Sequence, residues 1–252
     1  MSSNAIAVLG ERALREAKRT PDALLPTLLI PLFFLVVNVG QVAKVFPAST
    51  PFLEGQGYAA FQLPSSLLLA ASFGTSALYL VEEIEGGYFD KLRATPVHRS
   101  SLVLGRLVAV AVQSVLMTTV LVAVSLLFNV RIASGVFGFL LLVVLTALWA
   151  IGYAGFLQLV ALKTRSAAAT NSAGLVFFPL LFVTPNFVPR ELLSRPMEIA
   201  ATLNPVTYVV EAMRSLVLVD FDWPVIGLGF AVAGVFVVAM VALNVRTMSH
   251  YD

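Results

Sequence analysis

Long apolar runs separated by short charged connectors dominate this chain of 252 residues. Six intervals that lack Asp, Glu, Lys and Arg are long enough to cross a bilayer as helices, since a span takes about 20 apolar residues. They are residues 23–43, 55–81, 107–130, 132–162, 166–189 and 223–245. None alternates apolar and polar residues as a barrel strand does. Backbone groups in hydrocarbon must bond within their own segment, so the pattern predicts an all-α integral membrane protein with six transmembrane helices.

The six spans are expected within a single transmembrane domain that covers residues 1–252. We place them at about residues 23–43, 58–81, 102–128, 135–161, 167–188 and 224–245. The first run follows 22 residues and exceeds the length of a signal-peptide core, which is about 7–15 residues. We therefore interpret it as a retained first span.

Two segments outside the spans have mixed patterns. Residues 4–19 place apolar residues at helical spacing and add four basic residues, which predicts an interfacial helix on the inner leaflet. In residues 190–222 the longest charge-free stretch is residues 199–210. That stretch is too short to cross a bilayer and is more typical of a re-entrant or interfacial helix.

The distribution of Lys and Arg predicts the orientation. With the N-terminus inside, eleven of the 16 basic residues lie on inner segments and five on outer segments. We therefore expect both termini in the cytoplasm, the 82–101 connector inside and the 190–222 region outside. Arg outnumbers Lys twelve to four, which hints at a bacterial genome and hence at the bacterial plasma membrane.

Composition excludes several other kinds of site. The chain is 59% hydrophobic and 12% charged, whereas a soluble domain carries about 25% charged residues. It has no cysteine, which excludes disulfides and thiolate metal sites. His98 and His250 are far apart and lack further ligands, so no metal site is expected. The net charge of +2 gives no reason to expect nucleic acid as a partner.

The connector at residues 82–101 concentrates charge, with seven of the chain's thirty charged residues. Glu82, Glu83 and Glu85 would start a short helix and Lys91 and Arg93 would end it, each near the favourable pole of the helix dipole. Pro96 disfavours helix at the preceding residue. The pattern predicts a cytoplasmic helix at about residues 82–94 that docks a protein partner; a solvated turn is the open alternative.

Three blocks of residues resemble the permease subunits of ABC type-2 exporters, especially the drug-resistance type similar to daunorubicin exporters. The first block matches the family's spacing with Glu83, Glu85, Gly87, Leu92, Thr95, Pro96, Arg99, Gly105 and Arg106. The others are FVTPNFVPRELL at residues 182–193 and NPVTYVVEAMR at residues 204–214. The likeness covers essentially the whole chain, although Tyr88, Asp90 and Arg106 replace the family's usual Thr, Glu and Lys.

The resemblance implies an ATP-driven complex in which two ATPase subunits bind beneath two permeases, either a homodimer or a pair of close relatives. The chain has no phosphate-binding G-x-x-x-x-G-K-[ST] loop, so we expect a non-catalytic permease that binds no cofactor, with ATP and Mg²⁺ used by the partner ATPase. Residues 82–94 would be the coupling helix. Its expected ATPase-coupling residues are Glu83, Glu85, Gly87, Tyr88, Asp90, Leu92, Arg93 and Pro96.

The resemblance also implies an external gate of two short helices, at about residues 189–201 and 204–219. The expected gate residues are Pro189, Asn204, Pro205, Tyr208, Glu211 and Arg214. Asn204 is suited to cap the second helix, and Pro205 fits its first turn. Glu211 and Arg214 are three residues apart, so they can face one another.

The substrate path leaves a weaker trace in the sequence. Polar residues inside the spans are uncharged, for example Asn38, Gln62 and Gln158, and interhelical hydrogen bonding explains such residues more simply. Candidates for an apolar route are Phe33, Asn38, Phe73, Phe177 and Phe178, although aromatic residues in spans more often pack against lipid or neighbouring helices. These features favour export of a hydrophobic or amphipathic drug, lipid or related metabolite.

Two other classes of function stay open. An ATP-independent secondary transporter or channel would usually carry charged residues within its spans for ion coupling. A membrane-embedded lipid-modifying enzyme would need clustered Asp, His or Ser–His groups near the bilayer. A neighbouring gene for an ATPase with a phosphate loop would favour the exporter over both.

Overall fold

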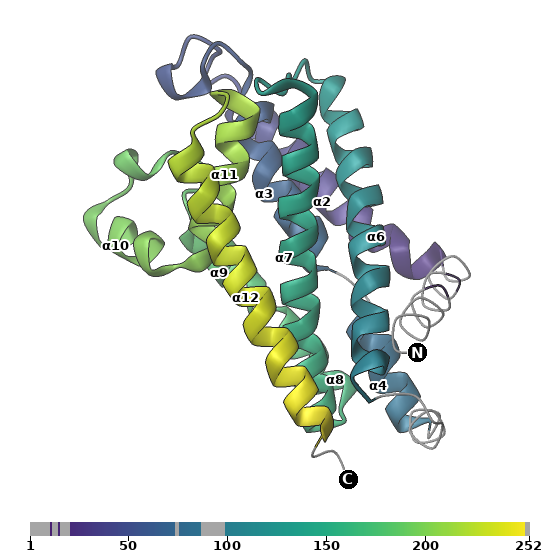
Figure 1. Cartoon of the computed structure of the whole chain (residues 1–252). Helices are drawn as coiled ribbons and strands as arrows, with labels where there is room; N and C mark the ends of the chain where they lie inside the picture. The colour runs from purple at the N-terminus through teal and green to yellow at the C-terminus, as the bar shows by residue number, and fades with distance from the viewer. Residues whose placement is uncertain (1–10, 12–14, 16–20, 74–75, 87–98, 250–252) are drawn as a thin grey trace.

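The computed structural model describes residues 11, 15, 21–73, 76–86 and 99–249. Every regular element in these ranges is a helix, which confirms the all-α class. The lower end of the bundle, as drawn in Figure 1, holds α4 (Ser76–Glu85), α8 (Ala167–Gly174) and the C-terminal end of α12 (Trp223–Ser249). The upper end holds the start of α3 (Tyr58–Ser72) and the end of α11 (Pro205–Leu218).

Three helices of the described ranges are long and apolar enough to cross a membrane, judged by length and composition. They are the Leu104–Leu126 part of α6 (Arg99–Leu126), α7 (Gly135–Thr164) and α12, with mean hydropathies of 2.4, 2.4 and 2.6. In α2 (Pro21–Val42) the apolar stretch Thr27–Val42 is shorter. The expected first, third, fourth and sixth spans thus each correspond to one helix, namely α2, α6, α7 and α12.

The structure divides the second expected span, residues 58–81, into two helices. α3 ends at Ser72 and α4 begins at Ser76. Phe73, which follows α3, has φ −88° and ψ 22°, outside the helical range. The next residue in the sequence is Gly74, and glycine has a low helix propensity. A search for charge-free stretches measures only apolarity, so it does not detect such a break.

The fifth expected span, residues 167–188, is also divided. α8 ends at Gly174, and α9 begins at Phe177 and ends at Val183. Pro179, inside the first turn of α9, has no N–H to continue a helix from α8. Thr184 is extended with ψ 166°, because the residue before a proline, here Pro185, avoids the helical region. The last residues of this expected span therefore form a loop.

α7 lies at the centre of the bundle, between α6 and α12 in Figure 1. In α7 the indole Nε1 of Trp149 donates a hydrogen bond to Ser72 Oγ of α3 at 2.9 Å. The Trp149 ring also packs against Phe177 of α9 and Phe236 of α12, at centroid distances of 6.2 and 5.3 Å. Because lipid is as apolar as a side chain, such packing and hydrogen bonds hold membrane helices together.

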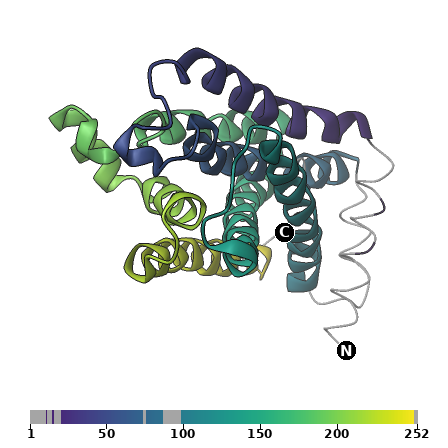
Figure 2. The same cartoon turned by 90° about the horizontal axis from the view of Figure 1, so that it is seen from above.

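α2 and the α10 region lie at the periphery of the bundle. Seen from above in Figure 2, α2 runs along one edge, and α10 (Arg195–Leu203) projects at one side next to α11. The short turns η1 (Pro51–Leu53) and η2 (Arg190–Leu192) belong to the connectors before α3 and before α10. Of the expected interfacial helix at residues 4–19, only Glu11 and Arg15 are described; both are helical and form an ion pair at 2.6 Å.

α11 and α12 pack tightly against each other at Gly229. A Cβ atom at this position would lie 2.3 Å from the Cβ of Ala212 and 2.9 Å from the backbone oxygen of Tyr208. Neither atom can rotate away, so a side chain would force α12 from α11. Around Gly227 and Gly234, by contrast, nothing lies within 4 Å of such a Cβ.

We predict that Gly229→Ala destabilises the protein by about 1–3 kcal/mol, the typical cost of overpacking a core. The thermal unfolding midpoint of the detergent-purified protein should fall. Gly227→Ala and Gly234→Ala are the matched controls and should leave the midpoint unchanged or slightly raised, since alanine favours helix. An equal midpoint for Gly229→Ala and Gly227→Ala would contradict the tight contact.

Candidate functional site

At the lower end, a buried ion pair joins α4 to α6. Arg106 Nη2 of α6 donates to Glu83 Oε2 of α4, and the two side chains are 11% and 9% exposed. Glu85 Oε1 accepts a hydrogen bond from the backbone N–H of Ala167, the first residue of α8, at 3.4 Å. The end of α4 is therefore tied to α6 and to the start of α8.

The three glutamates lie in the last turn of α4 and not, as expected, at the start of a new helix. The dipole of α4 disfavours anions there, but Arg106 offsets the charge of Glu83, and the N-terminal pole of α8 favours that of Glu85. Glu82 is exposed. The other expected ATPase-coupling residues, Gly87, Tyr88, Asp90, Leu92, Arg93 and Pro96, lie outside the described residues.

At the upper end, side chains fasten the loop at residues 184–189 to the bundle. Tyr58 Oη of α3 donates to Phe187 O at 2.8 Å, and Arg214 Nη2 of α11 donates to Pro185 O at 3.0 Å. Gln62 Nε2 lies 3.4 Å from Asn186 Oδ1. An extended loop with prolines cannot satisfy its own carbonyls, so these side chains from α3 and α11 supply the donors.

Arg214 is the central group of this arrangement, with only 8% of its surface exposed. Its guanidinium lies 3.6 Å from the centroid of the Phe61 ring, and its Nε donates to Phe61 O at 3.3 Å. Burial lowers the pKa of Arg214 to about 10, an effect that the nearby Glu211 carboxylate opposes. The group therefore stays charged at neutral pH.

Glu211 pairs with Arg190 and not with Arg214. Arg190 donates through Nε to Oε1 at 3.1 Å and through Nη2 to Oε2 at 2.7 Å, a bidentate contact about a quarter exposed. The expectation that Glu211 and Arg214 face one another is therefore wrong, because Arg214 turns towards α3 and the 184–189 loop. Burial raises the pKa of Glu211 above its usual value, and Arg190 works in the opposite direction.

The start of α11 follows the local prediction. Asn204 Oδ1 accepts a hydrogen bond from the backbone N–H of Val206 at 3.0 Å, and Pro205 occupies the first turn. Asn204 Nδ2 also donates to Leu180 O of α9 at 2.6 Å. Tyr208 Oη reaches back to Thr202 O of α10 at 2.6 Å. The residues expected to form a gate therefore hold α9, α10 and α11 together, and their role as a gate stays a prediction.

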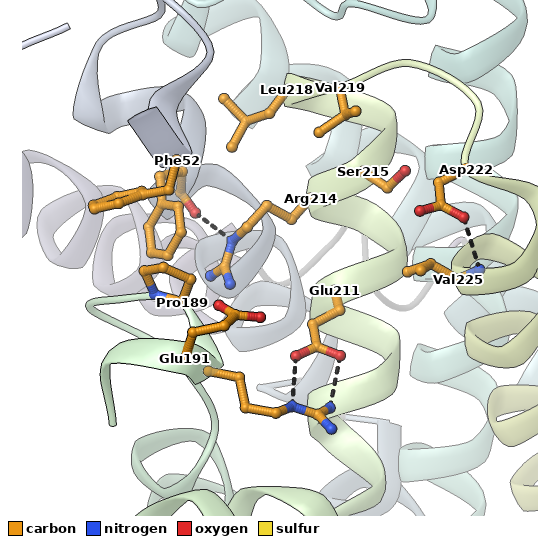
Figure 3. Close-up of a pocket in the computed structure, with 12 residues that line it drawn as sticks. Phe52, Pro189, Glu191, Glu211, Arg214, Ser215, Leu218, Val219, Asp222 and Val225 are labelled. Atoms are coloured by element: carbon orange, nitrogen blue, oxygen red, sulfur yellow. Dashed lines mark hydrogen bonds and ion pairs between the residues drawn. The ribbon is translucent and has the colours of Figure 1, made fainter. Parts of the chain in front are cut away.

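A pocket of about 400 Å³ opens beside α11 at the upper end. Its apolar lining comes from Phe52, Phe61, Pro189, Leu218, Val219 and Val225. Its charged lining comes from Arg190, Glu191, Glu211, Arg214 and Asp222. Three expected gate residues, Pro189, Glu211 and Arg214, thus meet in one pocket, as Figure 3 shows.

The expected path residues do not form one lining. Phe33 is 69% exposed on α2, whereas Phe177 is buried in the aromatic cluster around Trp149. Phe73 and Phe178 make an edge contact at 5.3 Å. Asn38 is buried on α2. Phe177 therefore packs against neighbouring helices, which was the alternative to a place in the substrate path.

Sequence reasoning missed the residues that hold the charged groups in place. Arg190 is the partner of Glu211, and Phe61 and the Pro185 carbonyl hold Arg214. In the connector before α3, Gln56 donates to Val217 O at 2.9 Å and accepts from the Arg131 N–H at 2.8 Å. These contacts join residues far apart in the chain, so the local sequence does not indicate them. Tyr58 and Phe61 are the exception, since aromatic residues at the start of an apolar run could have been noticed as candidates.

Comparison with known proteins gives a consistent result. Residues 4–218 match the family profile described as ABC-2 type transporter. The chain is 25% identical over 242 residues to the "Daunorubicin resistance ABC transporter permease protein DrrB1" of Streptomyces coeruleorubidus, which covers 93% of this chain and 82% of the relative. It is also 25% identical over 224 residues to the "Probable doxorubicin resistance ABC transporter permease protein DrrC" of Mycobacterium tuberculosis, covering 86% of this chain and 79% of the relative. With the "Putative transport permease ycf38" of Cyanophora paradoxa it shares 27% over 220 residues, or 83% and 72% of the two chains.

We predict that the Arg190–Glu211 contact weakens as the pH falls. A raised pKa means that Glu211 takes up its proton at a higher pH than a free glutamate does. The charged pair is therefore intact above this pKa and is lost as the pH falls through it. Hydrogen–deuterium exchange at residues 190–204, corrected for the intrinsic effect of pH, should rise as the pH falls.

In Glu211→Gln the exchange should be high already at neutral pH and should not change further with pH. Glu198→Gln, at the exposed Arg195–Glu198 pair, is the matched control and should behave as the unmodified protein does. An unmodified protein with pH-independent exchange would refute the titration of Glu211.

Proposed function

Because the chain belongs to the ABC-2 type transporter family and is the non-catalytic permease subunit of a drug-resistance-like exporter, we propose how it receives energy and what it moves. As a multi-pass membrane protein of this family, it works with a separate ATPase subunit. In our proposal two ATPase subunits bind a pair of permeases at the lower end, and ATP and Mg²⁺ are used only by the ATPases.

The observation that carries this proposal is the anchoring of the end of α4. Glu83 binds Arg106 of α6, and Glu85 meets the start of α8. The expected coupling helix at about residues 82–94 begins within the last turn of α4, and its residues 87–94 lie outside the described residues. A displacement of that segment by an ATPase would therefore move α4, α6 and α8 as one unit. The segment's own contacts with the ATPase stay a prediction.

The proposed topology places the lower end in the cytoplasm, with both termini, and the upper end outside. α2, α3–α4, α6, α7, α8–α9 and α12 would provide the six passages of the chain. α10 and α11 would act as the external gate, since Glu211 and Arg214 of α11 cluster with Pro189 and with Arg190 of η2 at the upper end. This orientation follows from the excess of basic residues on the segments assigned to the cytoplasm.

The proposed substrate is a hydrophobic or amphipathic molecule, a drug, a lipid or a related metabolite. The relatives named for daunorubicin and doxorubicin resistance support an amphipathic cargo. The apolar surfaces of α2, α6 and α12 would keep such a cargo within the bilayer phase. A bacterial plasma membrane is the proposed location.

We predict that Glu83→Gln uncouples ATP hydrolysis from transport. The change leaves Arg106 as a buried cation whose carboxylate partner has become neutral, and breaking such a pair is strongly destabilising, at about 3–5 kcal/mol. Co-expression with the partner ATPase subunit should still give a complex that hydrolyses ATP. Export of a hydrophobic dye per ATP hydrolysed should fall about tenfold or more, since each 1.4 kcal/mol corresponds to a factor of ten.

Two variants serve as controls for this experiment. Glu82→Gln alters an exposed neighbour in the same helix turn and should leave the amount of dye exported per ATP hydrolysed unchanged. Arg106→Lys keeps the charge opposite Glu83 and should retain most of the coupling. If Glu83→Gln exported normally, α4 would not transmit motion through this pair.

A further inference from the structure

The upper-end pocket combines a buried cation with exposed carboxylates, and neither the gate nor the ATPase coupling accounts for this. Arg214 lies at its inner wall and Glu191 at its exposed rim. In Figure 3 both side chains point into the same space next to Pro189. Apolar side chains, among them Phe52 and Val225, complete the lining of this space of about 400 Å³.

Most charges of this pocket are already matched. Arg190 and Glu211 form their bidentate pair. Asp222 accepts the backbone N–H of Val225 at the start of α12, at 3.4 Å, where the helix dipole favours an anion. Arg214 and Glu191 are different, because within the described ranges neither has an ion-pair partner within 4.0 Å.

Arg214 keeps capacity for a further ligand. Its Nε and Nη2 donate to the carbonyls of Phe61 and Pro185, while its Nη1 has no hydrogen-bond partner among the described residues. Burial of a cation without a carboxylate partner is costly, and a bound anion would offset that cost. Phosphate oxygens match the planar donor geometry of a guanidinium.

Glu191 provides a negative charge in the same pocket as the positive charge of Arg214. Its exposed carboxylate accepts no hydrogen bond from any described residue, and the Glu191 and Arg214 charges are close enough to influence each other. A ligand that carries a cation next to its anion would satisfy both. A purely anionic ligand would leave the charge of Glu191 unmatched and would be repelled by it.

We propose that this pocket binds the headgroup of a zwitterionic amphiphile, with its phosphate on Arg214 and its primary amine on Glu191. The acyl chains would leave past Phe52 and Val225 towards the apolar surface of the bundle. A membrane phospholipid and an exported cargo of the same chemistry would both fit. The inference takes only the outward orientation of the upper end from the proposed function.

The test is binding of short-chain lipids to the purified full-length permease in detergent, measured by calorimetry without ATPase or ATP. Dihexanoylphosphatidylethanolamine should bind about tenfold more tightly than dihexanoylphosphatidylglycerol, which has the phosphate but no amine. Only the ethanolamine lipid can donate a hydrogen bond from a charged amine to Glu191, and such a bond changes the affinity by about a factor of ten. Free phosphoethanolamine, which lacks the chains, should bind more weakly than the short-chain lipid. Equal binding of the free headgroup would overturn the amphiphile as ligand.

Two variants separate the two halves of the site. Glu191→Gln should abolish the preference for the ethanolamine headgroup, because the change removes the partner of the amine and also the charge that repels the anionic glycerol lipid. Arg214→Lys should weaken binding of both lipids about tenfold, because the ammonium lacks the guanidinium's fork. Should Arg214→Lys fail to fold, Glu191→Gln decides the matter, since its side chain is exposed.

Arg195→Gln and Glu198→Gln, in an exposed pair that does not line the pocket, are the matched controls and should change nothing. Equal affinity of the unmodified protein for the two lipids, or a preference that survives Glu191→Gln, would overturn the proposal. If the unmodified protein showed ATP-driven export but no preference for the ethanolamine lipid, only this inference would be overturned. If it preferred the ethanolamine lipid but showed no ATP-driven export, only the proposed function would be overturned.

Discussion

The cost of burying a charge determines the architecture of the upper end. Arg214 is almost completely withdrawn from solvent, and a buried cation must find hydrogen bonds or an anion. It finds the Phe61 carbonyl of α3 and the Pro185 carbonyl of the 184–189 loop, with the Phe61 ring against its face. Arg214 therefore joins α3, α11 and the loop after α9, where Tyr58 and Gln62 of α3 add further hydrogen bonds.

At the lower end, a buried charge is stabilised by an oppositely charged side chain. Glu83 is as buried as Arg214 but has a cation, Arg106, opposite it. Between the two ends the bundle holds together through packing around α7, where Trp149 meets Ser72, Phe177 and Phe236. A bundle with charged anchors at both ends and an apolar centre suits the proposed transmission of motion from an ATPase below to a gate above.

The sequence predicts those features that depend on one local property. Apolar length alone identified α6, α7 and α12, and the Asn204–Pro205 pair predicted the start of α11 because a cap and a first-turn proline are local chemistry. Apolar length did not reveal the breaks after Ser72 and Gly174, which depend on backbone geometry. The partners of Glu211 and Arg214 could not be predicted, because Arg190, Phe61 and Pro185 come from distant segments whose approach depends on the whole fold.

The central claim is that this helical body moves its cargo only when another polypeptide hydrolyses ATP. The most direct measurement is export of a hydrophobic dye by the permease reconstituted in liposomes, with and without its partner ATPase subunit. The account predicts export only when the ATPase and ATP are both present, and none with an ATPase that cannot hydrolyse ATP. Export of equal rate by the permease alone would contradict it.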